Sequence, residues 1–119
     1  MSKTNLEEAV RKYSGRLNDP SASSRVTGPC GDTMEFYLDI DPGGRIREVR
    51  FHADGCRMTE ACGAVVAFHA DGRALGEALF ISPGLVLASV GEVSEDHRHC
   101  AILASTTFYR AVADHMLKS

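Results

Sequence analysis

Hydrophobic and polar residues alternate in two neighbouring stretches of the chain, which is the pattern of half-buried β-strands. The first stretch places apolar residues at every second position: Met34, Phe36, Leu38 and Ile40. The second stretch continues in the same way with Val49, Phe51 and Ala53. Residues 41–44 (Asp-Pro-Gly-Gly) are a turn signal between them, so we predict an antiparallel hairpin. Residues 25–27 predict a short edge strand that follows a polar loop at 21–24.

The N-terminal segment shows helical spacing instead. Its apolar residues recur at intervals of three or four: Leu6, Val10, Tyr13 and Leu17. Thr4 with Glu7 three residues later matches a capping box, and residues 18–20 (Asn-Asp-Pro) stop a helix. We therefore predict a helix that begins at Thr4 and continues to Leu17.

Helical spacing returns after Cys56. The apolar residues there share one arc that should lie on the sheet: Met58, Ala61, Cys62, Val65, Val66 and Phe68. Residues 71–72 (Asp-Gly) end this helix, and residues 74–80 predict a short helical piece. Ser82 followed by Pro83 is a capping signal for a further helix that runs to about Val90.

The last helix begins near residues 97–100 (His-Arg-His-Cys). Its predicted apolar arc comprises Ile102, Thr106, Phe108, Tyr109, Val112, Ala113 and Met116, with Thr107, Arg110, Asp114 and Lys118 opposite. Cys100 then falls in the first turn, where unpaired N–H groups and the helix dipole favour an anion. We expect a Cys100 thiolate with a lowered pKa, ready to react or to bind metal.

A hairpin with one apolar face needs a cover, which the helices after it supply. We therefore predict an α/β fold of the α+β type: a small antiparallel three-stranded sheet with helices packed on it. A length of 119 residues is enough for one core, so we expect residues 1–119 to form a single domain.

Composition narrows the classes of function. A net charge of −3, with basic residues scattered among acidic ones, provides no electrostatic surface for nucleic acid. No apolar run approaches the ~20 residues of a membrane span, and residues 1–5 lack a signal-peptide core. We expect a cytoplasmic protein that binds neither nucleic acid nor membrane, in which four cysteines suit metal binding or catalysis better than disulfides.

Three cysteines lie at structural edges that should leave their sulfur accessible. Cys30 is in a glycine-flanked turn, Cys56 at a strand-to-helix junction and Cys100 at a helix start. Asp32 and His99 are their near neighbours in sequence. Thiolates with a carboxylate and an imidazole suit a tetrahedral zinc site or an iron–sulfur cluster.

The fourth cysteine has a different setting. Cys62 lies among apolar residues of its helix, and free cysteine is among the most buried residue types. We predict that it packs in the core; an extra sulfur carrier or alternative ligand is the other interpretation. A role for His97, close to His99, is left open.

Three segments resemble the signature motifs of iron–sulfur cluster assembly scaffolds, the IscU/NifU N-terminal family. They are residues 28–34 (GPCGDTM), 54–56 (DGC) and 99–104 (HCAILA), which lie in register along the chain. The resemblance implies a compact α/β domain that assembles a labile [2Fe–2S] cluster. The sulfur comes from a cysteine desulfurase, and the cluster is handed to apo iron–sulfur proteins. The same site can hold zinc.

Matched motif by motif, the resemblance implies Cys30, Cys56 and Cys100 as cluster ligands, with Asp32 and His99 as auxiliary groups. Three thiolates leave one position of a tetrahedral site, for which the two auxiliary groups compete. Asp32 can swing inward from a glycine-containing turn with less strain than His99. We therefore favour a metal-binding set of three cysteines and Asp32.

The chain departs from the family pattern in two places. The family's proline-containing element, where a dedicated Hsp70 chaperone docks, is replaced by residues 93–97 (Val-Ser-Glu-Asp-His), so we expect no such chaperone partner. After Cys56, residues 57–62 (RMTEAC) replace a run rich in glycine and serine.

Two functions from different classes follow. The first is a scaffold rather than an enzyme, which builds a cluster and releases it. The second is a zinc-dependent sulfurtransferase, in which one cysteine accepts persulfide sulfur from a desulfurase and passes it on. Asp32 favours the scaffold, because a hard oxygen ligand beside soft thiolates suits a cluster that must leave.

Overall fold

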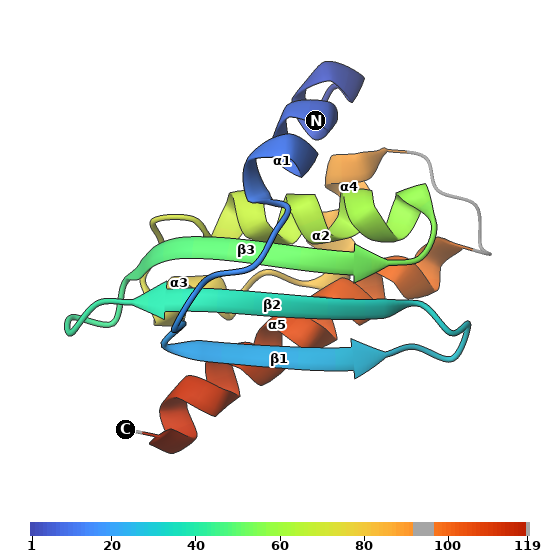
Figure 1. Ribbon diagram of the computed structural model, residues 1–119. Helices are drawn as coiled ribbons and strands as arrows, with labels where there is room; N and C mark the ends of the chain where they lie inside the picture. The colour runs from blue at the N-terminus through green and yellow to red at the C-terminus, as the bar shows by residue number, and fades with distance from the viewer. Residues whose placement is uncertain (92–96, 119) are drawn as a thin grey trace.

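The computed structural model describes residues 1–91 and 97–118 of the chain. Its elements, in order, are α1 (Lys3–Tyr13), β1 (Ala22–Thr27), β2 (Thr33–Ile40), β3 (Ile46–Asp54), α2 (Arg57–Ala70), α3 (Leu75–Ala78), α4 (Pro83–Val90) and α5 (Arg98–Lys118). The strands form one antiparallel sheet in the order β1-β2-β3, which confirms the predicted α+β fold (Figure 1). In the described part of the chain, no helix has the length and hydropathy to cross a membrane.

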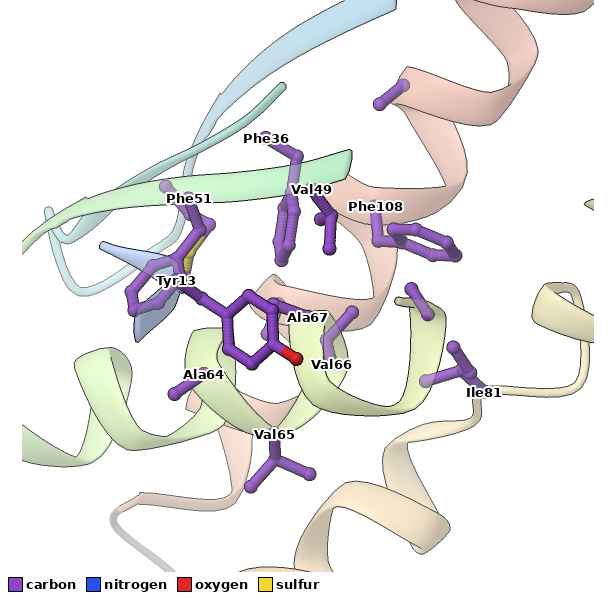
Figure 2. Packing of buried hydrophobic residues seen from close by; sticks show 14 of the residues in the cluster. Tyr13, Phe36, Val49, Phe51, Ala64, Val65, Val66, Ala67, Ile81 and Phe108 are labelled. Carbon is purple, nitrogen blue, oxygen red and sulfur yellow. The ribbon is translucent and has the colours of Figure 1, made fainter. Parts of the chain in front are cut away.

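Helices cover one face of the sheet because alternate strand residues point toward them. On β2, Met34, Phe36, Leu38 and Ile40 are all buried, as the alternation predicted. Helix α5 packs on β1 and β2, while α2 packs on β3 and α5. The rings of Phe36 and Phe108 meet edge to face at 5.7 Å, and Figure 2 shows this aromatic layer between sheet and helices.

Two elements begin earlier than the sequence predicted. The N-cap of α1 is Ser2, whose Oγ accepts a hydrogen bond from the Asn5 N–H at 3.1 Å, so the capping box at Thr4 is wrong. Strand β1 begins at Ala22 and includes the serines expected in a loop. Pairing with β2 explains this, since Ser24 lies opposite a buried phenylalanine and its hydroxyl also bonds to α5.

Helix α1 also ends earlier, at Tyr13 rather than Leu17. The N–H of Gly15 donates to the carbonyl of Phe51 at 2.8 Å, and Ser14 forms a parallel bridge with the same residue. The chain leaves the helix because β3 offers this backbone partner. A tertiary contact therefore overrides the helical spacing that included Leu17.

The buried face of α5 is rotated from the predicted arc. Thr107 is fully buried, whereas Ile102 is 55% exposed and Met116 is 60% exposed. Phe108 and Val112 of the predicted arc are buried, but the other buried residues include small ones outside that arc: Ala101, Ala104, Ser105 and Ala111. Small side chains let helix and sheet approach closely, and the hydroxyl of Thr107 donates to the carbonyl of Leu103 within the same helix.

The apolar arc also predicted burial for one residue of α2 that the structure shows to be exposed. Phe68 is 48% exposed, while the neighbouring Ala67 and Ala70 are fully buried.

The remaining helix signals are confirmed. Ser82 caps α4 by accepting from the Leu85 N–H at 3.1 Å, and α4 ends at Val90.

Candidate functional site

Three segments far apart in sequence meet at one end of the sheet. They are the loop between β1 and β2, the junction between β3 and α2, and the first turn of α5 (Figure 1). These are the segments that carry the predicted cysteines. The fold therefore brings the three motif regions together, as the resemblance implied.

The loop at residues 28–32 is a tight turn that separates Cys30 from Asp32. The N–H of Gly28 donates to the carbonyl of Asp32 at 2.8 Å, and the N–H of Gly31 donates to the carbonyl of Gly28 at 3.0 Å. Gly31 has a φ of 91°, a conformation that favours glycine. This turn leaves Cys30 exposed at the tip.

Asp32 is half-buried and lies against the β3–α2 junction. A Cβ atom on Gly55 would lie 2.4 Å from the carboxyl carbon of Asp32, so only glycine leaves room for this carboxylate. The N–H of Cys56 donates to its Oδ2 at 3.4 Å. The carboxylate therefore sits at the start of α2, where free N–H groups favour an anion.

The pKa of the Asp32 carboxyl is held below its usual value. The main cause is a hydrogen bond from the Thr59 hydroxyl, to which the Cys56 N–H and the thiols of Cys30 and Cys56 add, against an opposing effect of burial. Asp32 is consequently ionised at neutral pH. It supplies a negative oxygen donor next to two sulfur atoms.

Cys56 and Cys100 have opposite environments. Cys56 is exposed, and its thiol pKa is lowered, chiefly by a hydrogen bond with the Thr59 side chain. Cys100 is fully buried in the first turn of α5, and burial raises its thiol pKa. The expectation of an accessible Cys100 with a lowered pKa is therefore wrong, because the packing of α2 against α5 removes water from this helix start.

The structure brings three of the predicted residues into one group. The ligand atoms of Asp32, Cys56 and Cys100 all lie within 4.8 Å of one another. Cys30 is outside this group, and so is His99, whose Nε2 lies 3.7 Å from the Cys100 sulfur. One carboxylate oxygen and two sulfurs match the donors that zinc and iron–sulfur iron accept.

Sequence reasoning missed Thr59, which lies at the centre of this group. Its side chain is fully buried, and Oγ1 donates to Asp32 Oδ2 at 2.5 Å. The same Oγ1 lies 3.4 Å from each of the sulfurs of Cys56 and Cys100. The spacing offered a signal, since residues three apart at a helix start share a face and Thr59 follows Cys56 by three.

The remaining candidates lie away from this group or outside the described residues. Cys62 is fully buried, as predicted for a core residue, and burial raises its thiol pKa to about 12. His97 is half-buried just before α5. Residues 93–96, in the stretch that replaces the chaperone-docking element, lie outside the part of the chain that the structure describes.

Comparison with known proteins shows that the chain is similar to members of one family. Residues 10–119 match the family described as the NifU-like N terminal domain. The iron–sulfur cluster assembly scaffold protein IscU 1 of Archaeoglobus fulgidus is 29% identical over 106 residues, which cover 88% of this chain and 69% of that protein. The corresponding IscU of Escherichia coli K12 is 31% identical over 103 residues, covering 85% and 80% of the two chains.

Solved structures show the same fold. A NifU-like N-terminal protein from Brucella abortus superposes with a TM-score of 0.73 at 20% identity, covering 99% of this chain and 95% of that one. A candidate scaffold of the SUF system from Fervidobacterium islandicum AW-1 gives a TM-score of 0.71 at 18% identity, covering 94% and 96%.

Proposed function

The chain belongs to the NifU-like N-terminal domain family, and on that premise we propose that it is a scaffold on which an iron–sulfur cluster is assembled and then passed on. The observation that carries this proposal is the grouping of Asp32, Cys56 and Cys100 within 4.8 Å at one end of the sheet. A site made of a carboxylate and thiols can bind iron and sulfide without any further reaction on a small molecule. The protein acts as a carrier rather than as an enzyme.

The cargo is a [2Fe–2S] cluster held by Cys30, Cys56 and Cys100, with Asp32 completing the ligand set. Cys30 is exposed on a glycine-containing turn directly next to the group, which supports its movement toward the other ligands when the cluster forms. His99 is the auxiliary imidazole beside Cys100. Zinc occupies the same donors when no cluster is present.

Exposure of the site suits a cluster that must leave again. Asp32 is half-buried and Cys56 exposed, so one side of the donor group is open to solvent. A carboxylate is a poorer match for cluster iron than a thiolate, which weakens one attachment. A cysteine desulfurase supplies the sulfur as a persulfide, a two-electron reductant such as a pair of thiols converts that sulfur to sulfide, and apo iron–sulfur proteins receive the finished cluster.

The zinc-dependent sulfurtransferase remains the second candidate because Cys30 is not one of the three donors that lie within 4.8 Å of one another. Zinc would be held by Asp32, Cys56 and Cys100, and the exposed Cys30 would accept sulfur. In that step the Cys30 thiolate attacks the outer sulfur of the desulfurase persulfide. A new S–S bond forms, the old one breaks, and the desulfurase cysteine leaves as a thiolate.

Anaerobic reconstitution separates the two functions. The protein is incubated with ferrous iron, cysteine and a desulfurase, and the visible absorbance of the cluster is compared with the zinc content of the protein as isolated. We expect cluster absorbance that is lost in Cys30→Ser, Cys56→Ser and Cys100→Ser. The matched control is Cys62→Ala, which should load normally. A protein that retains zinc and never gains cluster absorbance would overturn the scaffold in favour of sulfur transfer.

A further inference from the structure

Thr59 is a buried hydroxyl that contacts every member of the donor group. From these contacts we propose that Thr59 is a positioning residue, whose hydroxyl holds Asp32 and the sulfurs of Cys56 and Cys100 in place before a metal ion arrives. The inference rests on the proposed function, because it concerns the same site. It adds a residue that belongs to none of the three motif segments.

The Thr59 hydroxyl is directed at the site. A threonine inside a helix commonly donates to a carbonyl of the preceding turn, and the fully buried Thr107 does so, to Leu103 at 2.7 Å. Thr59 is equally buried but lies in the first turn of α2, which no helical turn precedes, and its hydroxyl donates to Asp32, 27 residues away in the chain. Its bond is therefore directed at the site rather than used within its own helix.

The hydroxyl of Thr59 also makes the shorter of two hydrogen bonds to Asp32 Oδ2. Its Oδ2 accepts from the Thr59 hydroxyl at 2.5 Å and from the Cys56 N–H at 3.4 Å. The second bond is close to the upper limit for a hydrogen bond, so the hydroxyl is the main attachment. Without it, a half-buried carboxylate on a turn can rotate toward water and leave the sulfurs without their oxygen partner.

The side chain of Thr59 is also stiffer than an unbranched one. A threonine in a helix divides mainly between two χ1 rotamers, so the backbone of α2 limits Oγ1 to few positions. That single atom lies 3.4 Å from the buried sulfur of Cys100 and 3.4 Å from the exposed sulfur of Cys56. Loss of a group that orients metal ligands in this way typically lowers metal affinity roughly 10–100-fold.

The test measures zinc affinity by competition with a chromophoric chelator, so that it does not depend on cluster transfer. Thr59→Ala and Thr59→Ser form a matched pair, because the two side chains differ only by the hydroxyl. We expect Thr59→Ala to bind zinc roughly 10–100-fold more weakly and Thr59→Ser to stay within about threefold of the unmodified protein. Thr107→Val is the control for loss of a buried hydroxyl elsewhere and should bind zinc normally.

A second comparison asks whether Thr59 acts through Asp32. In an Asp32→Ala background, the further change Thr59→Ala should weaken zinc binding by less than it does alone, because Asp32, which makes the shortest of the three contacts of the Thr59 hydroxyl, is absent. Equal losses in both backgrounds would overturn the proposal, as would equal affinities for the alanine and serine variants or a matching loss in Thr107→Val.

Separate measurements test whether each variant folds and whether the protein is a scaffold. Thermal unfolding of each metal-free variant reports whether the fold is intact; if Thr59→Ala does not fold, Thr59→Val, which keeps the side-chain volume, replaces it in both comparisons. An unmodified protein that binds zinc but never assembles a cluster would count against the scaffold alone, and the affinity comparisons would still decide the role of Thr59. An unmodified protein that binds neither would overturn both.

Discussion

The carboxylate of Asp32 occupies the space that a side chain at position 55 would fill. A Cβ on Gly55 would lie 2.4 Å from the Asp32 Cγ and 2.5 Å from its Oδ2. The φ of Gly55 is not in the left-handed region, so the backbone conformation does not require glycine here. The close contact with Asp32 does. The two residues come from different turns, and their contact joins the β1–β2 loop to the start of α2.

Gly55→Ala should therefore displace Asp32 and weaken metal binding. The carboxylate must move away from Cβ and lose its bonds from Thr59 and the Cys56 N–H, so we expect zinc affinity to fall by roughly tenfold or more. Gly76→Ala in α3 is the matched control, because a Cβ there meets nothing within 4 Å. Zinc titration of both variants checks this; equal affinities would show that the Asp32 position is not required.

Asp32→Ala should still load a cluster on the three cysteines but release it more slowly. Water or another side chain then replaces a weak ligand whose movement helps the cluster leave. The measurement is the rate of cluster transfer from the loaded variant to an apo-ferredoxin. A rate equal to or faster than that of the unmodified protein, with normal loading, would leave Asp32 as an ordinary turn residue and point to His99 as the fourth ligand.

The four cysteines should differ in their reactivity toward an alkylating reagent. With a thiol pKa of about 12, Cys62 is ionised to only about one part in ten thousand at pH 8. Burial also raises the pKa of Cys100, whereas Cys30 and Cys56 are exposed. We expect iodoacetamide to modify Cys30 and Cys56 first, as read by mass spectrometry, and all four cysteines to react alike in the unfolded protein. Early labelling of Cys62 would contradict this order.

Cys62→Ala should reduce stability without affecting cluster assembly. Removing a small buried side chain from the contact between α2 and the core costs about 1 kcal/mol. Chemical denaturation measures the loss, and reconstitution measures the loading. A variant that folds normally but takes up no cluster would instead make Cys62 a ligand or a sulfur carrier.

The chaperone prediction stands on the sequence alone, since residues 93–96 lie outside the described part of the chain. The stretch 93–97 contains no proline and no lysine, so a peptide of residues 91–99 should not stimulate the ATPase of a dedicated Hsp70. The positive control is a peptide with the family's proline-containing element. Stimulation of the ATPase by micromolar 91–99 peptide would show that the chaperone binds this segment without the proline-containing element.

The sequence by itself determined the features that depend on near neighbours. Alternation along β2 and β3, the turn at 41–44 and the Ser82 cap of α4 were all predicted correctly, because strand period, turn chemistry and capping involve residues a few positions apart. The three motif segments also included the parts of the chain that meet at one end of the sheet. The end of α1 and the start of β1 were predicted wrongly because distant partners intervened, Phe51 at Gly15 and strand β2 along β1. The N-cap of α1 was also wrong, although Ser2 bonds to Asn5 only three positions away.

Only the tertiary structure decided the burial and the connections within the site. The helix pattern placed Cys100 at an accessible first turn, but the packing of α2 on α5 buries it and raises its pKa. Thr59 bonds to Asp32 across 27 residues and to Cys100 across 41. Exposure, pKa and hydrogen-bond partners depend on which distant segments come into contact. Periodicity and capping signals involve near neighbours and do not give those contacts.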